Sequence, residues 1–172
     1  MPPEEKFMKR TGRKKDTLKK IVLISAAVAV LAGVSWAVRI RVTGGWTEII
    51  DFNDLQGGPG SDLISSYESL VDAVDIDITG AGNALWEVDI RRVDTNWQPA
   101  LTLEARRTSS HPDVYGGTAY QQVIMSDQLF FYTNVRANNA RNIKIQYRLS
   151  GVSVQIPPGN YNTMVYYTVI AR

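Results

Sequence analysis

The sequence has 172 residues and no cysteine. This absence excludes disulfide bonds, thiolate metal sites and cysteine nucleophiles. Small exported domains often rely on disulfides, so an exported domain of this composition has to be stabilised by apolar burial and sheet hydrogen bonds. A domain of about 130 residues is large enough, because it buries roughly two-thirds of the surface of its unfolded chain.

Histidine is nearly absent, because His111 is the single example. It lies between Ser109 and Asp113, but the members of a hydrolytic triad meet in space from separate elements, so their adjacency in sequence is no evidence for one. The sequence contains no nucleophile elbow, phosphate loop, metal-binding histidine motif or dinucleotide fingerprint. It therefore predicts a non-enzymatic protein without catalytic residues or a cofactor, with His111 in an exposed loop.

The sequence has a single long hydrophobic run, which spans residues 21–38 and carries no charge. Its length is 38 − 20 = 18 residues. A membrane-spanning helix needs about 20 residues, and the core of a signal peptide has roughly 7 to 15, so the length fits either one. A helix that is apolar on every face needs apolar surroundings. We therefore expect one N-terminal hydrophobic helix that enters a membrane, at least transiently.

Positive charge is concentrated ahead of this run. Residues 1–37 contain eight Lys or Arg and three acidic residues, a net charge of +5, whereas the remainder has 19 − 8 = 11 basic and 17 − 3 = 14 acidic residues, a net charge of −3. The pI of about 8.9 thus comes from the leader and gives no reason to expect nucleic-acid binding. The positive-inside rule keeps residues 1–20 cytoplasmic and places the chain from residue 39 onward outside.

Small residues at the end of the run form a signal-peptidase pattern. Ser35 and Ala37 occupy the two positions that the peptidase reads, which predicts cleavage after Ala37. The protein is then secreted or held at the cell surface. A retained anchor is the alternative, with a single membrane pass and the C-terminal domain outside.

Helical periodicity is absent beyond residue 39, where apolar residues recur with a period of two. Val74, Ile76 and Ile78 illustrate the pattern, which returns at 86–91, 101–105, 143–149 and 152–156. Each segment places one face on a core and one in water, and clusters of Gly, Pro and Asn separate them. The sequence thus predicts an all-β protein, an antiparallel sandwich or barrel over residues 62–172.

Three further segments carry strand predictions. Residues 39–61 form either the first strand, followed by a Gly-rich loop, or an extended arm that adds to the sheet of a neighbour; strand character continues over 46–52. Residues 62–72 are expected to be strand or turn. The last strand, 161–171, is apolar on both faces and is expected at the centre of a sheet.

The C-terminal segment 152–170 carries a turn and an alternating strand, with Pro157, Gly159 and Tyr161 followed by Thr163, Val165, Tyr167 and Val169. It resembles the C-terminal hairpin of pilin-like and spore-coat-U-like secreted β-sandwich domains. The resemblance implies an Ig-like sandwich and subunit assembly through strand exchange.

Candidate ligand residues are few. Asp51, Asn53 and Asp54 supply the oxygen ligands that calcium prefers, and Trp46 and Trp97 are candidate aromatic contacts for a glycan or a partner. The basic pairs 91–92 and 106–107 are expected on solvated faces beside acidic residues.

These features favour an exported structural or adhesion protein of the cell surface or of a filament. We expect it to act through a partner or through a homo-oligomer formed by strand-edge pairing. An extracytoplasmic glycan- or calcium-binding module is the alternative.

Overall fold

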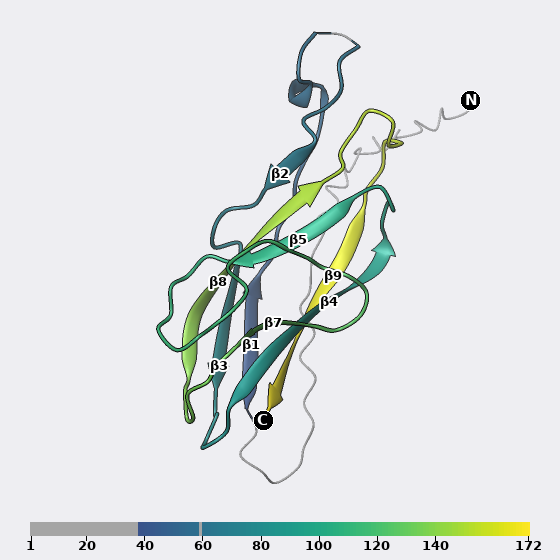
Figure 1. The fold of residues 1–172 in the computed structure, drawn as a ribbon. Coiled ribbons are helices and arrows are strands. Elements are labelled where there is room, and N and C mark those ends of the chain that lie inside the picture. Colours follow the sequence, from purple (N-terminus) through teal and green to yellow (C-terminus); the bar gives the residue numbers. More distant parts are fainter. Residues whose placement is uncertain (1–37, 59) are drawn as a thin grey trace, which may run out of the picture.

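The computed structural model describes residues 38–58 and 60–172, which are built almost entirely from strands (Figure 1). Nine strands and one short 3-10 helix follow one another in this part of the chain: β1 (Arg39–Gly44), η1 (Phe52–Asp54), β2 (Ser66–Glu68), β3 (Val74–Thr79), β4 (Trp86–Asn96), β5 (Thr102–Arg107), β6 (Gln121–Gln122), β7 (Gln128–Tyr132), β8 (Ala140–Ser150) and β9 (Asn162–Ala171). All pairings between these strands are antiparallel. The all-β prediction is confirmed.

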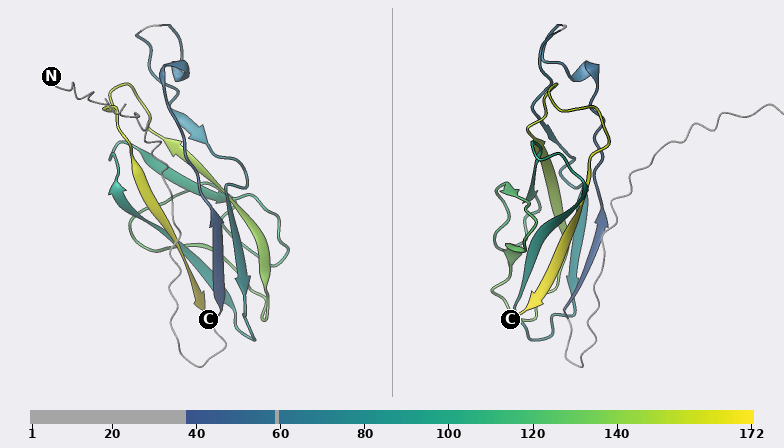
Figure 2. Two further views of the ribbon diagram at one scale, coloured as in Figure 1. Left: turned by 180° about the vertical axis from the view of Figure 1, so that it is seen from behind. Right: turned by 90° about the vertical axis from the view of Figure 1, so that its right-hand side faces the viewer.

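The strands form two sheets that share one core. The larger sheet has the order β1-β3-β8-β5-β6 with β2 also paired to β8, and the smaller has the order β7-β4-β9. Ile76 and Ile143 from the larger sheet and Trp86 and Phe131 from the smaller one are completely buried in the same cluster. Figure 2 shows the two layers face to face, an arrangement consistent with a β-sandwich.

One buried hydrogen bond joins the two layers across the core. The hydroxyl of Tyr147 in β8 lies 2.7 Å from the hydroxyl of Tyr167 in β9. Burial raises the pKa of Tyr147 to about 12 and also raises that of Tyr167. Both hydroxyls are therefore protonated, and one donates to the other in the buried space between the sheets.

The period-two segments at 74–78, 86–91 and 143–149 lie in strands, as predicted, and the segment at 101–105 does so from Thr102 onward. Residues 62–72 contain β2 and a turn. The start of the domain is a first strand, because β1 pairs with β3 from Arg39↔Thr79 to Gly44↔Val74. Residues 46–51, which also had strand character, form no strand and lead instead into η1.

The strand predicted at 152–156 is wrong. β8 ends at Ser150, and Gly151 turns the chain with a φ of +82°, where a Cβ atom would lie 2.3 Å from the carbonyl oxygen of Ala100. This glycine ends the strand because no other residue fits the turn. The 152–170 segment is not a hairpin either, since β8 and β9 belong to different sheets.

The central position predicted for the last strand is also wrong, because β9 is an outer strand of the smaller sheet. Its inward side chains, such as Val165 and Tyr167, enter the core. Its outward aromatic residue, Tyr166, is covered by the guanidinium of Arg91 from β4, 4.7 Å from the ring centroid. The inward apolar residues of β9 thus face the core, and on its outer face Tyr166 is covered by an arginine.

Residues 1–37, with most of the hydrophobic run 21–38 and the expected cleavage site at Ala37, lie outside the described residues. In the part of the chain that is described, no helix has the length and apolar character to cross a membrane.

Candidate binding surfaces

A loop projects beyond the sheets at one end of the molecule (Figures 1 and 2). This tip loop, residues 45–65, begins where β1 ends and returns to β2. The pairing of Leu55 with Leu63 and the hydrogen bond from the Gln56 N–H to the Asp62 carbonyl, at 2.9 Å, close its outer part. The outer part of the tip loop is therefore closed by its own backbone.

The acidic residues of the tip loop that were candidate calcium ligands cap η1. The Asp51 carboxylate accepts a hydrogen bond from the Asn53 N–H at 2.7 Å, and the Asp54 carboxylate accepts one from the Asp51 N–H at 2.9 Å. This reciprocal arrangement is a capping box. No group of three His, Cys, Asp or Glu able to hold a metal occurs among the described residues, and calcium binding by Asp51, Asn53 and Asp54 stays a prediction.

A second loop braces the tip loop from the side. The Asp62 carboxylate accepts hydrogen bonds from the Val154 N–H at 2.8 Å and the Ser153 hydroxyl at 3.1 Å. The backbone hydrogen bond from Val154 is the main reason that the pKa of Asp62 is lowered. The segment predicted as a strand at 152–156 thus supports the tip loop.

Large apolar side chains lie exposed on the tip loop and its brace. Ile49 is 79% exposed and Phe52 is 77% exposed, and Ile64 and Val154 are also exposed. Single exposed apolar residues are ordinary, but several on one projecting element make that element a candidate interaction surface.

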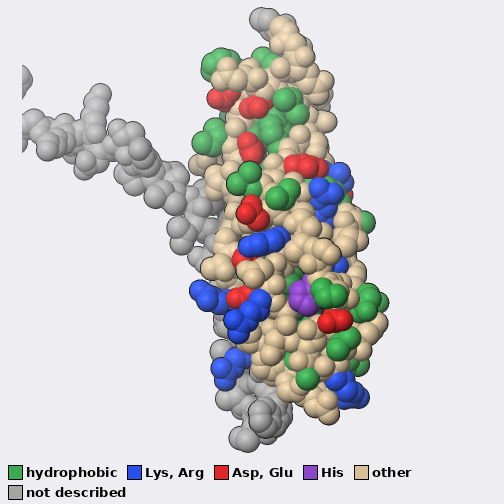
Figure 3. All heavy atoms as spheres, turned by 90° about the vertical axis from the view of Figure 1, so that its left-hand side faces the viewer, with side chains coloured by type: hydrophobic (Ala, Val, Ile, Leu, Met, Phe, Trp, Pro, Cys, Tyr) green, Lys and Arg blue, Asp and Glu red, His purple; other side chains and the backbone are tan. Residues whose placement is uncertain are grey.

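The tip loop also carries the negative charge of the domain. It contains Glu48, Asp51, Asp54 and Asp62 and no Lys or Arg, so the rest of the domain has 11 basic and 14 − 4 = 10 acidic residues, a net charge of +1. None of the four acids forms an ion pair with a described Lys or Arg. The top of Figure 3 accordingly shows apolar and acidic side chains without basic ones.

The opposite end of the molecule is basic. Arg39 pairs with Thr79 and Ala171 with Trp86, so the start of β1 and the end of β9 both lie beside the short loop 80–85. We call this region the basic end and define it by its exposed residues: Arg39, Val135, Arg136, Arg141, Ile170 and Arg172. Among the described residues Arg172 pairs with Glu87, whereas the other three arginines have no carboxylate partner.

This chain matches no family model, no curated protein and no solved structure. Its function is therefore argued from the chemistry of its own surfaces.

The two candidate tryptophans are partly buried. Trp46 and Trp97 both pack against the two core clusters. The indole of Trp97 donates to the Leu101 carbonyl at 3.0 Å, and the guanidinium of Arg92 lies 4.9 Å from its ring centroid. Glycan stacking on these rings stays a prediction, and the contacts give both residues a packing role.

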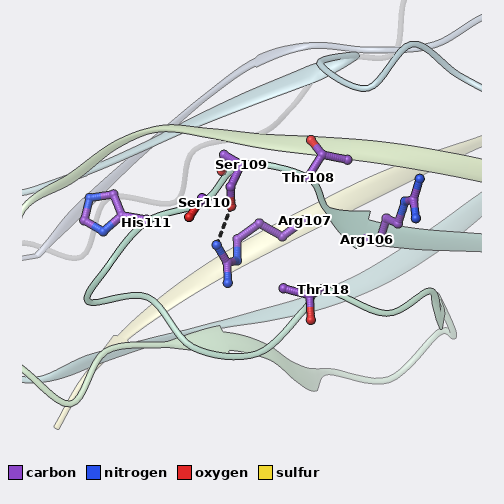
Figure 4. A pocket seen from close by; sticks show the side chains of 7 residues that line it. All are labelled: Arg106, Arg107, Thr108, Ser109, Ser110, His111 and Thr118. Carbon is purple, nitrogen blue, oxygen red and sulfur yellow. Dashed lines mark hydrogen bonds between the residues drawn. The ribbon is translucent and has the colours of Figure 1, made fainter.

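His111 is half-buried, in contrast to the exposed position that was expected, and it lines a pocket of about 450 Å³ (Figure 4). Its Nδ1 accepts a hydrogen bond from the Asp113 N–H at 3.4 Å, and the Ser109 hydroxyl oxygen accepts one from the Lys144 N–H. No hydrogen bond joins His111 to a serine hydroxyl in the described chain.

The two basic pairs were expected on solvated faces beside acidic residues. This is correct for Arg91 and Arg92 and wrong for Arg107. Arg91 pairs with Asp127 and Arg92 with Asp94. Arg107, however, is buried, because alternation along β5 turns it toward the core while Arg106 points outward. The period-two pattern of residues 101–107 was the signal in the sequence that placed Arg107 on the inner face.

Proposed function

We propose that this chain is an exported, non-enzymatic structural or adhesion protein that assembles by binding the tip loop of one copy to the basic end of the next. The observation that carries the proposal is the separation of charge. Four acidic side chains without cationic partners surround exposed apolar residues at one end, and arginines without carboxylate partners surround Val135 and Ile170 at the other.

A second copy of this chain fits the tip loop because its basic end supplies the positive charge that the tip loop lacks. Opposite charges on two surfaces steer their encounter and favour one orientation. A contact between two different surfaces of identical subunits is heterologous, and it continues into an open filament unless a rotation closes it. Filament formation thus follows from the position of the two surfaces at opposite ends.

Export is part of the proposal and is supported by the leader. A basic segment before an apolar run of 18 residues directs the domain across a membrane. Cleavage after Ala37 leaves the amino group of Val38 next to Arg39, which adds positive charge to the basic end. A retained anchor would instead hold the basic end at the membrane and point the tip loop away from it.

We also propose that the sandwich is of the Ig-like class, related to the pilin-like domains that the C-terminal segment resembles. Support comes from the repeated passage of the chain between the sheets, at β3 to β4, β4 to β5, β6 to β7, β7 to β8 and β8 to β9. Such crossings are typical of Greek-key sandwiches.

Sedimentation velocity of the native protein, isolated after export, tests assembly. The average mass is expected to rise with protein concentration and to fall at high salt, because salt screens charge contacts. The tip variant Ile49→Ser/Phe52→Ser and the end variant Arg136→Glu/Arg141→Glu should each remain monomeric. An equimolar mixture of the two should give pairs and nothing larger, because one variant keeps its basic end and the other keeps its tip loop.

Leu70→Ser is the matched control, since Leu70 is also 77% exposed but lies outside both surfaces. It should assemble like the unchanged chain. A chain that stays monomeric at every concentration overturns the proposal. Assembly that persists in both variants also overturns it and favours pairing through the outer strands β1 and β9.

A further inference from the structure

Arg107 is a buried cation without an anionic partner. Its side chain comes from the end of β5, and the residue is only 6% exposed. No carboxylate of the described chain lies within ion-pair distance of it. Buried charges in proteins are otherwise paired, because removing a lone charge from water is costly.

Backbone carbonyls hold the Arg107 guanidinium in place. Its Nε donates to the Gly116 carbonyl at 3.1 Å, one terminal nitrogen to Ser109 at 2.5 Å and the other to Val114 at 3.0 Å. A guanidinium has five N–H groups, so these contacts leave one on each terminal nitrogen. Desolvation lowers the pKa of Arg107, but an arginine keeps its charge at neutral pH.

The pocket of about 450 Å³ opens beside this guanidinium. Its lining contains no acidic residue and consists of Arg106, Arg107, Thr108, Ser109, Ser110, His111 and Thr118. Figure 4 shows the Arg107 guanidinium between the 109–111 segment and Thr118. Hydroxyl-bearing side chains and a fixed positive charge therefore line a space large enough for a small anion.

We propose that this pocket binds a tetrahedral oxyanion, the sulfate or phosphate group of a small ligand or of a substituted glycan. The anion would neutralise Arg107, using the two remaining N–H groups of the planar guanidinium, which suit oxyanions. Its further oxygens would accept hydrogen bonds from the hydroxyls of Ser110 and Thr118. The bound anion supplies the charge partner that the protein itself does not provide.

Two-dimensional NMR of the full chain in detergent, titrated with sodium sulfate, sodium phosphate, sodium acetate or sodium chloride at constant ionic strength, tests this site. Sulfate or phosphate should produce saturable shifts of amide signals within 106–118, with a dissociation constant in the millimolar range or below. Tighter sulfate binding points to a sulfated ligand, and tighter phosphate binding points to a phosphate ester. Acetate, which lacks the third and fourth oxygens, should bind at least tenfold more weakly.

Two variants separate binding from folding. Arg107→Lys keeps the positive charge but loses the planar guanidinium. Ser110→Ala/Thr118→Val removes two hydroxyls and leaves the carbonyl contacts of Arg107 in place. Each variant should weaken sulfate and phosphate binding at least tenfold. If Arg107→Lys no longer gives the dispersed NMR spectrum of a folded protein, the Ser110→Ala/Thr118→Val variant alone tests whether the pocket binds the anion. Arg41→Gln, which removes an exposed arginine without a carboxylate partner, should bind like the unchanged chain. Shifts that fail to saturate, that chloride reproduces, or that both variants retain overturn the proposal.

Discussion

At the scale of single residues, Tyr147 and Tyr167 show how one contact can tie two layers together. Their hydroxyls, 2.7 Å apart, are each other's partners in the core. Removing one hydroxyl leaves the other buried without a hydrogen bond, which costs more than removing both. The pair therefore acts as a unit between β8 and β9.

Tyr147→Phe is expected to lower the free energy of unfolding by about 1.5 kcal/mol, the cost of an unsatisfied buried hydroxyl. The double variant Tyr147→Phe/Tyr167→Phe should lose clearly less than the sum of the two single variants. Chemical denaturation of all four proteins measures this cycle. Additive losses would show that the two hydroxyls do not depend on each other.

The same pair predicts a loss of stability at alkaline pH. Burial raises the pKa of Tyr147 from the ordinary tyrosine value of 10.0 to about 12 and also raises that of Tyr167. Their contribution is complete below pH 10 and is lost as pH rises through the folded pKa, because the unfolded chain releases these protons first. The fall in unfolding free energy between pH 10 and 12 should be smaller in the double Phe variant.

At the scale of elements, glycines decide where strands β1 and β8 stop. Gly44 ends β1 with a φ of +109°, and a Cβ atom there would lie 2.2 Å from the carbonyl oxygen of Ala73. Gly151 does the same after β8. In both places the chain turns against the backbone of another segment, and only glycine permits the approach.

Gly44→Ala should therefore lower the free energy of unfolding by about 2 kcal/mol, through backbone strain and the clash with Ala73. Gly58→Ala is the matched control, since nothing lies within 4 Å of a Cβ atom at that position. It should leave stability nearly unchanged. Thermal unfolding of the two variants makes the comparison, and equal losses would contradict the close approach at Gly44.

At the scale of the whole molecule, the two ends of the sandwich differ in charge and in their relation to the leader. The chain enters at the basic end, where β1 begins, and the tip loop lies at the other end (Figure 1). Whether the basic end is available to a second copy therefore depends on what happens to residues 1–37.

Cleavage after Ala37 is the outcome that we expect, and it frees the basic end. The native protein should begin at Val38, as measured by intact mass and N-terminal sequencing of the fractionated protein. Ala37→Leu should block cleavage, because the peptidase requires a small residue there. A mature mass that Ala37→Leu leaves unchanged identifies the run as a permanent anchor.

The sequence by itself determined the class of the fold and most of its strands, because alternation at Val74–Ile78 or Ile143–Leu149 reports directly which face meets a core. It also determined the charge of the leader and the apolar length of residues 21–38. These properties depend on neighbouring residues alone.

Only the tertiary structure decided which strands are neighbours. It also decided which residues come together in the candidate sites. The outward face of β9 is covered at Tyr166 by Arg91, and the turn at Gly151 lies against Ala100; both partners are distant in sequence. The alternation of residues 101–107 predicts the burial of Arg107. It does not predict that three backbone carbonyls would hold the guanidinium or that no carboxylate would pair with it. The carbonyl partners lie within nine residues of Arg107, in the loop that follows β5, and the irregular course of that loop is not contained in the alternating pattern of the strand.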